Sequence, residues 1–167
     1  ELGERLFADR SGTPLSKFTQ GMLVKSDLTN MLQVVSELSG MPLFMDDRPP
    51  DSVGGLKARV KLAKARSSVN LVIVDHLLLF PHTDKRTPRH QQLVEVTRDL
   101  KQMAKDLELT VMVLNQLNSD ADGEEPTDKN FSESKAVLQN LDVSILLHRE
   151  TKTSEEMLCK VTKSRKG

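Results

Sequence analysis

Asn70-Leu71-Val72-Ile73-Val74-Asp75 is the stretch that decides the fold, and a second run of the same kind, Thr110-Val111-Met112-Val113-Leu114-Asn115-Gln116, follows about 40 residues later. Each run is apolar at nearly every position and ends in a polar residue. Such runs predict short strands buried on both faces, as in a parallel sheet covered by helices. The carboxyl ends of parallel strands open into a crevice where ligands bind. We therefore expect Asp75 and Gln116 to lie at neighbouring strand ends.

Helix-like and strand-like patterns alternate through the rest of the chain. The patterns predict helices within residues 1–9, 28–38, 53–63 and 93–107, and strands at residues 42–45, 70–75, 110–116, 142–148 and 155–162. Ser26 is the predicted N-cap of the second helix and Gly40 its stop, and Asp51 or Ser52 caps the third. This alternation predicts an α/β fold, a mostly parallel sheet with flanking helices and right-handed crossovers. The last two strands, joined by a polar turn, are expected to form an antiparallel pair.

The composition restricts the classes of partner. The 167 residues carry 24 Lys plus Arg and 24 Asp plus Glu, so no overall field attracts nucleic acid and any such contact must come from local patches. No apolar run approaches the length of a membrane span, so we expect no membrane contact. The single Cys159 cannot form an internal disulfide and indicates a cytoplasmic protein.

Two interpretations are open for each strand-end side chain. Asp75 caps the following turn, or, coming after four hydrophobic residues, it is the carboxylate of a Walker B site that holds magnesium beside nucleotide phosphates, usually through water. Gln116 satisfies loop backbone groups, or its amide hydrogen-bonds a γ-phosphate or a water and reports the loss of that phosphate.

Two polar segments near the carboxyl end are further candidates. Lys163 and Arg165 are two residues apart at the end of a predicted strand, where side chains alternate, so they are expected to face the same side roughly 7 Å apart. They form a solvated basic terminus, or they clamp an anion, for which the arginine fork is well suited; a neighbouring subunit's nucleotide is the natural target. Phe131-Ser132-Glu133-Ser134-Lys135-Ala136 is a capped helix start, or a ligand-gripping loop that moves with nucleotide state.

Five segments, in order, resemble the carboxyl-terminal motor domain of the DnaB-type replicative DNA helicases, which has a RecA-like core. Leu43-Phe44-Met45-Asp46-Asp47 is similar to that family's strand ending in Asp-Asp. Val74-Asp75-His76-Leu77-Leu78-Leu79-Phe80 resembles its Walker B segment, commonly Ile-Asp-Tyr-Leu-Gln-Leu-Met. Thr97-Arg98-Asp99-Leu100-Lys101-Gln102-Met103-Ala104-Lys105 resembles Ser-Arg-x-Leu-Lys-x-Leu-Ala-Lys. Asn115-Gln116-Leu117-Asn118 matches Ser-Gln-Leu-Asn, and Lys163-Ser164-Arg165-Lys166-Gly167 resembles Lys-Gln-Arg-Asn-Gly.

The resemblance implies roles for these residues in a parent protein that couples ATP hydrolysis to 5′-to-3′ translocation on single-stranded DNA and to duplex unwinding. Asp75 is expected to hold Mg²⁺ through water, and Asp75 and Gln116 are both expected to bind ATP. Gln116 is the expected γ-phosphate sensor, and Lys163 and Arg165 are expected to reach the adjacent subunit's γ-phosphate in catalysis. The implied partners are single-stranded DNA, further copies in a homo-hexameric ring, a helicase loader and primase.

The departures from the family pattern are equally informative. The sequence contains no Gly-x-x-x-x-Gly-Lys-Ser/Thr loop, and we expect that loop and the catalytic Glu to lie upstream of Glu1. The family's loop Leu-Arg-Glu-Ser-Gly-Ala corresponds to residues 131–136, with Ser132 in place of Arg and Lys135 in place of Gly. Ser132, Glu133 and Lys135 are the expected DNA-binding residues, with the cation displaced. These changes suggest a divergent member from a phage or plasmid.

We therefore expect residues 1–167 to be a partial RecA-like motor domain in which the amino-terminal part of the core is missing. Alone, this chain is expected not to hydrolyse ATP. Two other functions remain open: a recombinase or clock-type RecA-like ATPase, and a non-catalytic module that joins or blocks a helicase ring.

Overall fold

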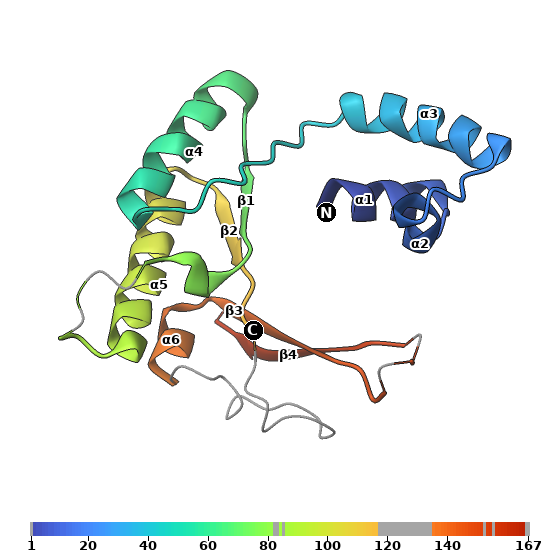
Figure 1. The fold of residues 1–167 in the computed structure, drawn as a ribbon. Helices are drawn as coiled ribbons and strands as arrows, with labels where there is room; N and C mark the ends of the chain where they lie inside the picture. The colour runs from blue at the N-terminus through green and yellow to red at the C-terminus, as the bar shows by residue number, and fades with distance from the viewer. Residues whose placement is uncertain are drawn as a thin grey trace. The chain divides into compact units, whose positions relative to one another are not determined.

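The protein divides into two compact units, residues 1–46 and residues 47–167, each described here by itself. The structure, a computed structural model, describes residues 2–81, 84, 86–116, 135–151, 153–154 and 156–165. The first unit is helical and consists of α1 (Leu2–Ser11), α2 (Leu15–Thr19) and α3 (Lys25–Ser39) (Figure 1). None of the helices in the described part of the chain is long and apolar enough to cross a membrane.

The start of α3 is fixed by Asp27 rather than by the predicted cap Ser26. The Asp27 carboxylate accepts the backbone N–H of Val24 at 3.0 Å and the Lys17 ammonium at 3.1 Å. These two bonds, the backbone bond first, hold the pKa of Asp27 below its usual range. A carboxylate in the first helical turn also suits the helix dipole. Ser26 lies inside the helix, whereas Gly40 ends it as predicted.

The strand predicted at residues 42–45 is wrong. Residues 42–47 lie in no helix or strand, and the Leu43, Phe44 and Met45 side chains are exposed. A strand exists through its ladder with a neighbour, and no described residue pairs with this segment. The apolar pattern alone could not reveal this.

The second unit contains both pairs of strands. Its elements are α4 (Val53–Ser67), β1 (Leu71–Val74), the 3-10 turn η1 (Leu77–Leu79), α5 (Arg89–Asp106), β2 (Thr110–Val113), α6 (Lys135–Asn140), β3 (Val143–His148) and β4 (Leu158–Ser164). As predicted, β1 and β2 pair in parallel, with Val74 beside Val113, and β3 pairs with β4 antiparallel. In Figure 1, α4 and α5 lie on one side of β1 and β2. The cap Ser52 accepts Gly55 N–H at 3.0 Å and starts α4, one of the two predicted alternatives.

The core lies between α5 and the parallel strands. The predicted apolar stripe of α5 is confirmed at Leu93, Leu100 and Met103, which are buried together with Leu77 and Phe80 from the segment after β1. The inward side chains of β1 and β2 pack against this cluster. Burial of this stripe supplies the main hydrophobic stabilisation of the unit.

Burial of β1 and β2 on both faces, as predicted, is wrong. The side chains of Leu71, Ile73, Met112 and Leu114 on the other face are between 42% and 57% exposed. In β3 the pattern is the same, because Ser144 and Leu146 are buried while Val143, Ile145 and Leu147 are exposed. Each strand pair therefore has one apolar face that the described residues leave uncovered.

The substitution Leu93→Ala should lower the free energy of unfolding of the second unit by about 2–5 kcal/mol, because it leaves a cavity in a fully packed site. Chemical denaturation of the protein that carries this chain measures the change. The matched control is Leu62→Ala on α4, whose side chain is 54% exposed, and which should cost little. Equal losses for the two substitutions would contradict the placement of the core.

Candidate functional site

Asp75 and Gln116 follow adjacent strand ends, as predicted. Asp75 comes directly after β1, and the N–H of Leu114, directly after β2, donates to Val74 O at 3.0 Å. The N–H of Leu77 then donates back to Leu114 O at 3.0 Å. The two chain segments that leave the sheet are thus joined on both sides of Asp75. Gln116 lies two residues beyond this junction, and its side chain is exposed, like that of Asp75.

The turn after Asp75 is held rigidly. Leu77 and Phe80 anchor it in the core, and the Arg89 guanidinium at the start of α5 donates from Nη2 to Leu78 O at 3.1 Å and to Phe80 O at 2.7 Å. The Asp75–His76 peptide bond is cis. These contacts fix the backbone that carries the carboxylate, while the carboxylate itself faces solvent.

The chemistry of this edge suits a nucleotide-bound divalent cation. The Asp75 side chain is 70% exposed, and its Oδ1 lies 4.0 Å from His76 Nδ1. A carboxylate oxygen is a hard ligand, and Mg²⁺ commonly binds one or two carboxylates while keeping several waters and phosphate oxygens. Among the described residues no group of three His, Cys, Asp or Glu could hold a metal ion. Asp75 therefore fits a site in which phosphate oxygens and water supply further ligands.

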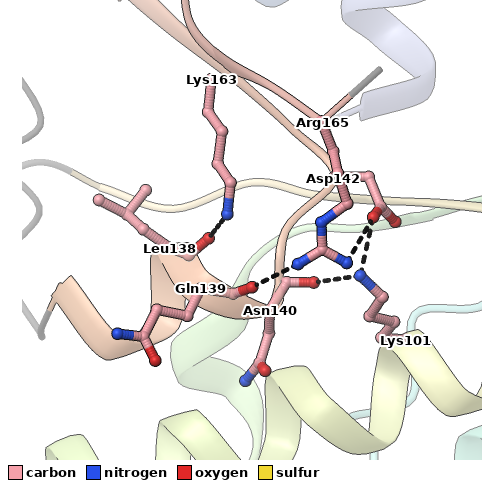
Figure 2. Close-up of polar contacts among 7 residues, drawn as sticks. All are labelled: Lys101, Leu138, Gln139, Asn140, Asp142, Lys163 and Arg165. Carbon is pink, nitrogen blue, oxygen red and sulfur yellow. Dashed lines mark hydrogen bonds and ion pairs between the residues drawn. The ribbon is translucent and has the colours of Figure 1, made fainter.

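Lys163 and Arg165 lie at the end of α6, where three cations meet the last three carbonyl groups of the helix (Figure 2). Lys163 Nζ donates to Leu138 O, Arg165 Nη2 to Gln139 O at 3.0 Å, and Lys101 Nζ to Asn140 O at 3.1 Å. The carboxyl end of a helix carries unpaired carbonyl groups and partial negative charge, so cations are favourable there. Both side chains therefore reach the same end of α6.

Asp142 connects two of these cations. Its Oδ1 accepts Lys101 Nζ at 2.7 Å and lies 3.2 Å from Arg165 Nη1 (Figure 2). The hydrogen bond from Lys101 is the main cause that holds the pKa of Asp142 below its usual range, with Arg165 and Lys105 adding and burial opposing. Since folding lowers this pKa, the stability contributed by Asp142 is present above the pKa of the unfolded chain. It is lost as the pH falls through the folded value.

The structure does not bring the two predicted groups together. The hydrogen bonds and ion pairs that it gives for Lys163 and Arg165 go to residues 138–142, and none joins them to Asp75 or Gln116. Ser132 and Glu133 lie outside the described residues. Lys135 begins α6, but its side chain is likewise outside the described part.

Sequence reasoning missed Lys101, Asn140 and Asp142. Lys101 lies on α5 outside the apolar stripe, and Asp142 was assigned to the start of a strand. Asn140 Nδ2 donates to Val94 O and Thr97 Oγ1, both at 3.0 Å, and so fastens the end of α6 to α5. No local spacing signals these contacts, because they join residues about 40 positions apart.

Comparison with known proteins gives a consistent family. The family model described as DnaB-like helicase C terminal domain matches residues 1–167. The replicative DNA helicase DnaB of Mycobacterium leprae (strain TN) is 32% identical over 154 residues, which are 89% of this chain and 25% of that protein. The replicative DNA helicase DnaB of Treponema pallidum (strain Nichols) is 28% identical over 166 residues, 99% of this chain and 38% of that protein. The chain thus spans between a quarter and two fifths of the length of these relatives.

Solved structures confirm the predicted RecA-like α/β fold class. The ATPase domain of G40P superposes with a TM-score of 0.88 at 22% identity, covering 98% of this chain and 62% of that chain. A second solved structure, described as a DnaB-like replicative helicase and its interactions with primase, also superposes with a TM-score of 0.88 at 22% identity. The match covers 98% of this chain and 42% of that chain. On the family match over its whole length, this chain belongs to the DnaB-like helicase C-terminal domains.

Proposed function

We propose that this chain is the part of a replicative DNA helicase motor domain that follows the Walker A loop. The observation that carries the proposal is the pair Asp75 and Gln116, placed at adjacent ends of parallel strands in a member of this family. The parent couples ATP hydrolysis to translocation along single-stranded DNA and to duplex unwinding. It works in the cytoplasm.

Asp75 and Gln116 have different roles at the nucleotide. The Asp75 carboxylate would hold a magnesium ion through water, and that ion would neutralise charge on the nucleotide phosphates. Gln116 donates its amide N–H to the γ-phosphate and passes the loss of that phosphate to the segment that follows it. The rigid turn between Asp75 and Phe80 keeps the carboxylate at one place while substrate enters. Such pre-organised positioning is the protein's main contribution to phosphoryl transfer.

Among the described residues, β2 pairs with β1 on one side only. A cleft of about 760 Å³ is lined by Val111 and Val113 of β2, by Leu100 and Lys101 of α5, and by residues 141–143. The N–H groups of Thr110 and Leu114 donate to β1, so those of Val111 and Val113 point away from β1, toward a further strand. We assign this edge to the strand that leads into the Walker A loop, and the uncovered apolar face to the helix that follows it.

Lys163 and Arg165 act on a neighbouring subunit. Their described contacts are with the end of α6, and the resemblance to the family assigns them to the γ-phosphate of the adjacent subunit. The ring of six copies supplies that neighbour. An arginine at the terminal turn of β4 can place its planar fork on phosphate oxygens.

The segment before α6 is assigned to single-stranded DNA through Ser132, Glu133 and Lys135. The family match favours this assignment over a recombinase or clock-type ATPase. A helicase loader and primase are the further partners, the latter because a protein of the same fold was solved with its interactions with primase. A non-catalytic module that blocks a ring differs from the motor in one respect: no Walker A loop would accompany this chain.

The 167-residue chain alone should release no phosphate from ATP at steady state with magnesium and single-stranded DNA, because the phosphate cradle and the water-activating Glu are outside it. In the protein that carries a Walker A loop, Asp75→Asn should abolish turnover. Asp99→Asn removes an exposed carboxylate on α5 and should leave turnover unchanged. If the 167-residue chain alone hydrolyses ATP and Asp75→Asn abolishes that activity, the proposal that hydrolysis needs residues outside this chain is wrong.

Arg165→Ala in the full-length protein should reduce hydrolysis by roughly 10³–10⁵, the usual contribution of an arginine finger, without weakening nucleotide binding by its own subunit. Titrating mutant subunits into wild-type rings and following phosphate release tests the action in trans. Arg98→Ala, a change of an exposed arginine on α5, is the matched control. If sites that receive a wild-type Arg165 from the neighbour remain inactive, action across the interface is wrong.

Lys135→Ala should weaken binding of single-stranded DNA equally for all sequences, because a phosphate contact carries no sequence information. It should also lower the slope of log affinity against log salt by about 0.7, the share of one phosphate contact. Fluorescence anisotropy at several salt concentrations measures both, with Lys61→Ala on α4 as the control. An unchanged slope assigns Lys135 to a capped helix start instead.

A further inference from the structure

We propose that Asp142 is a positioning residue that orients the Arg165 guanidinium toward the neighbouring subunit's nucleotide, and that Lys101 acts through Asp142. This inference rests on the proposed role of Arg165 and adds to it. Asp142 Oδ1 lies 3.2 Å from Arg165 Nη1 (Figure 2). Asp142 O also accepts the backbone N–H of Arg165 at 2.9 Å. Asp142 therefore contacts both the backbone and the side chain of the same arginine.

Asp142 is itself held from the side of α5. The Lys101 side chain is only 19% exposed and donates to both Asp142 Oδ1 and Asn140 O. Asn140 is in turn fastened to Val94 and Thr97 of α5. The carboxylate that receives Arg165 is thus fixed to the helix that forms the core.

The ion pair between Arg165 and Asp142 is exposed to solvent. The Arg165 side chain is 51% exposed and that of Asp142 61%, so the pair contributes little to stability. The described residues engage the two terminal nitrogens, Nη1 at Asp142 and Nη2 at Gln139 O. A guanidinium has five N–H donors, so this grip restricts the long side chain while leaving donors for a phosphate. Limiting rotamer freedom before the reaction lowers the entropic cost of reaching the transition state.

A role in orientation predicts a specific kinetic pattern in the full-length helicase. Asp142→Asn should lower kcat for ATP roughly tenfold to a hundredfold, the cost of misplacing a catalytic group. The KM for ATP should change little, because the subunit's own nucleotide site is untouched. Asp106→Asn is the matched control: Asp106 is also paired with a lysine, Lys57, but it is the last residue of α5 and has no contact with Arg165 among those described.

Two comparisons separate orientation from general stability. In the double variant Asp142→Asn with Arg165→Ala, kcat should equal that of Arg165→Ala alone, because Asp142 acts only through Arg165. Lys101→Met should reproduce the loss seen with Asp142→Asn, whereas Lys101→Arg, which retains the cation, should restore most of kcat. If Asp142→Asn does not assemble into rings, the comparison of Lys101→Met with Lys101→Arg tests the inference instead.

The outcomes are distinct. An unchanged or raised kcat for Asp142→Asn overturns the inference, a raised value meaning that Asp142 restrains Arg165 instead of directing it. Additive losses in the double variant also overturn it. If Arg165→Ala itself leaves kcat intact, the proposed finger fails, and Asp142 loses the partner through which it would act.

Discussion

The packing of α5 against β1 and β2 is the interaction on which the rest of the second unit depends. Its buried stripe, with Leu93 and Met103 at the centre, holds the parallel strands in register. Two basic side chains of the same helix then form hydrogen bonds with other segments of the unit. Arg89 fixes the turn that follows Asp75, and Lys101 fixes Asp142. One helix therefore sets the position of the turn after Asp75 and of the three cations at the end of α6, although these two groups have no direct bond among the described residues.

The strand pairs show what the described chain lacks for a complete core. Strands of a RecA-like sheet are covered by helices on both faces, yet the outer side chains of β1, β2 and β3 are apolar and exposed. Contiguous apolar surface of this kind marks a place where another segment packs. The sequence pattern predicts burial of these strands on both faces, whereas the described residues cover only one face. The structure shows which of the two faces the present residues cover.

The sequence predicts the fold correctly where a local pattern decides it. The prediction fails where pairing between distant residues decides the structure. The stripe of α5, the cap Ser52 and the parallel placement of Asp75 and Gln116 follow from short-range spacing. The strand at residues 42–45 did not form, because its partner is not among the described residues. The pairing of Lys101 with Asp142 could not be found either, since charge at one position carries no information on which distant charge it meets.

The three cations at the end of α6 also bear on the stability of that helix. α6 has six residues, too few to be stable without tertiary support, and Lys163, Arg165 and Lys101 each engage one of its terminal carbonyls. Lys101 is the fixed cation, because it is mostly buried. The three cations therefore supply at the carboxyl end of α6 the tertiary support that so short a helix needs.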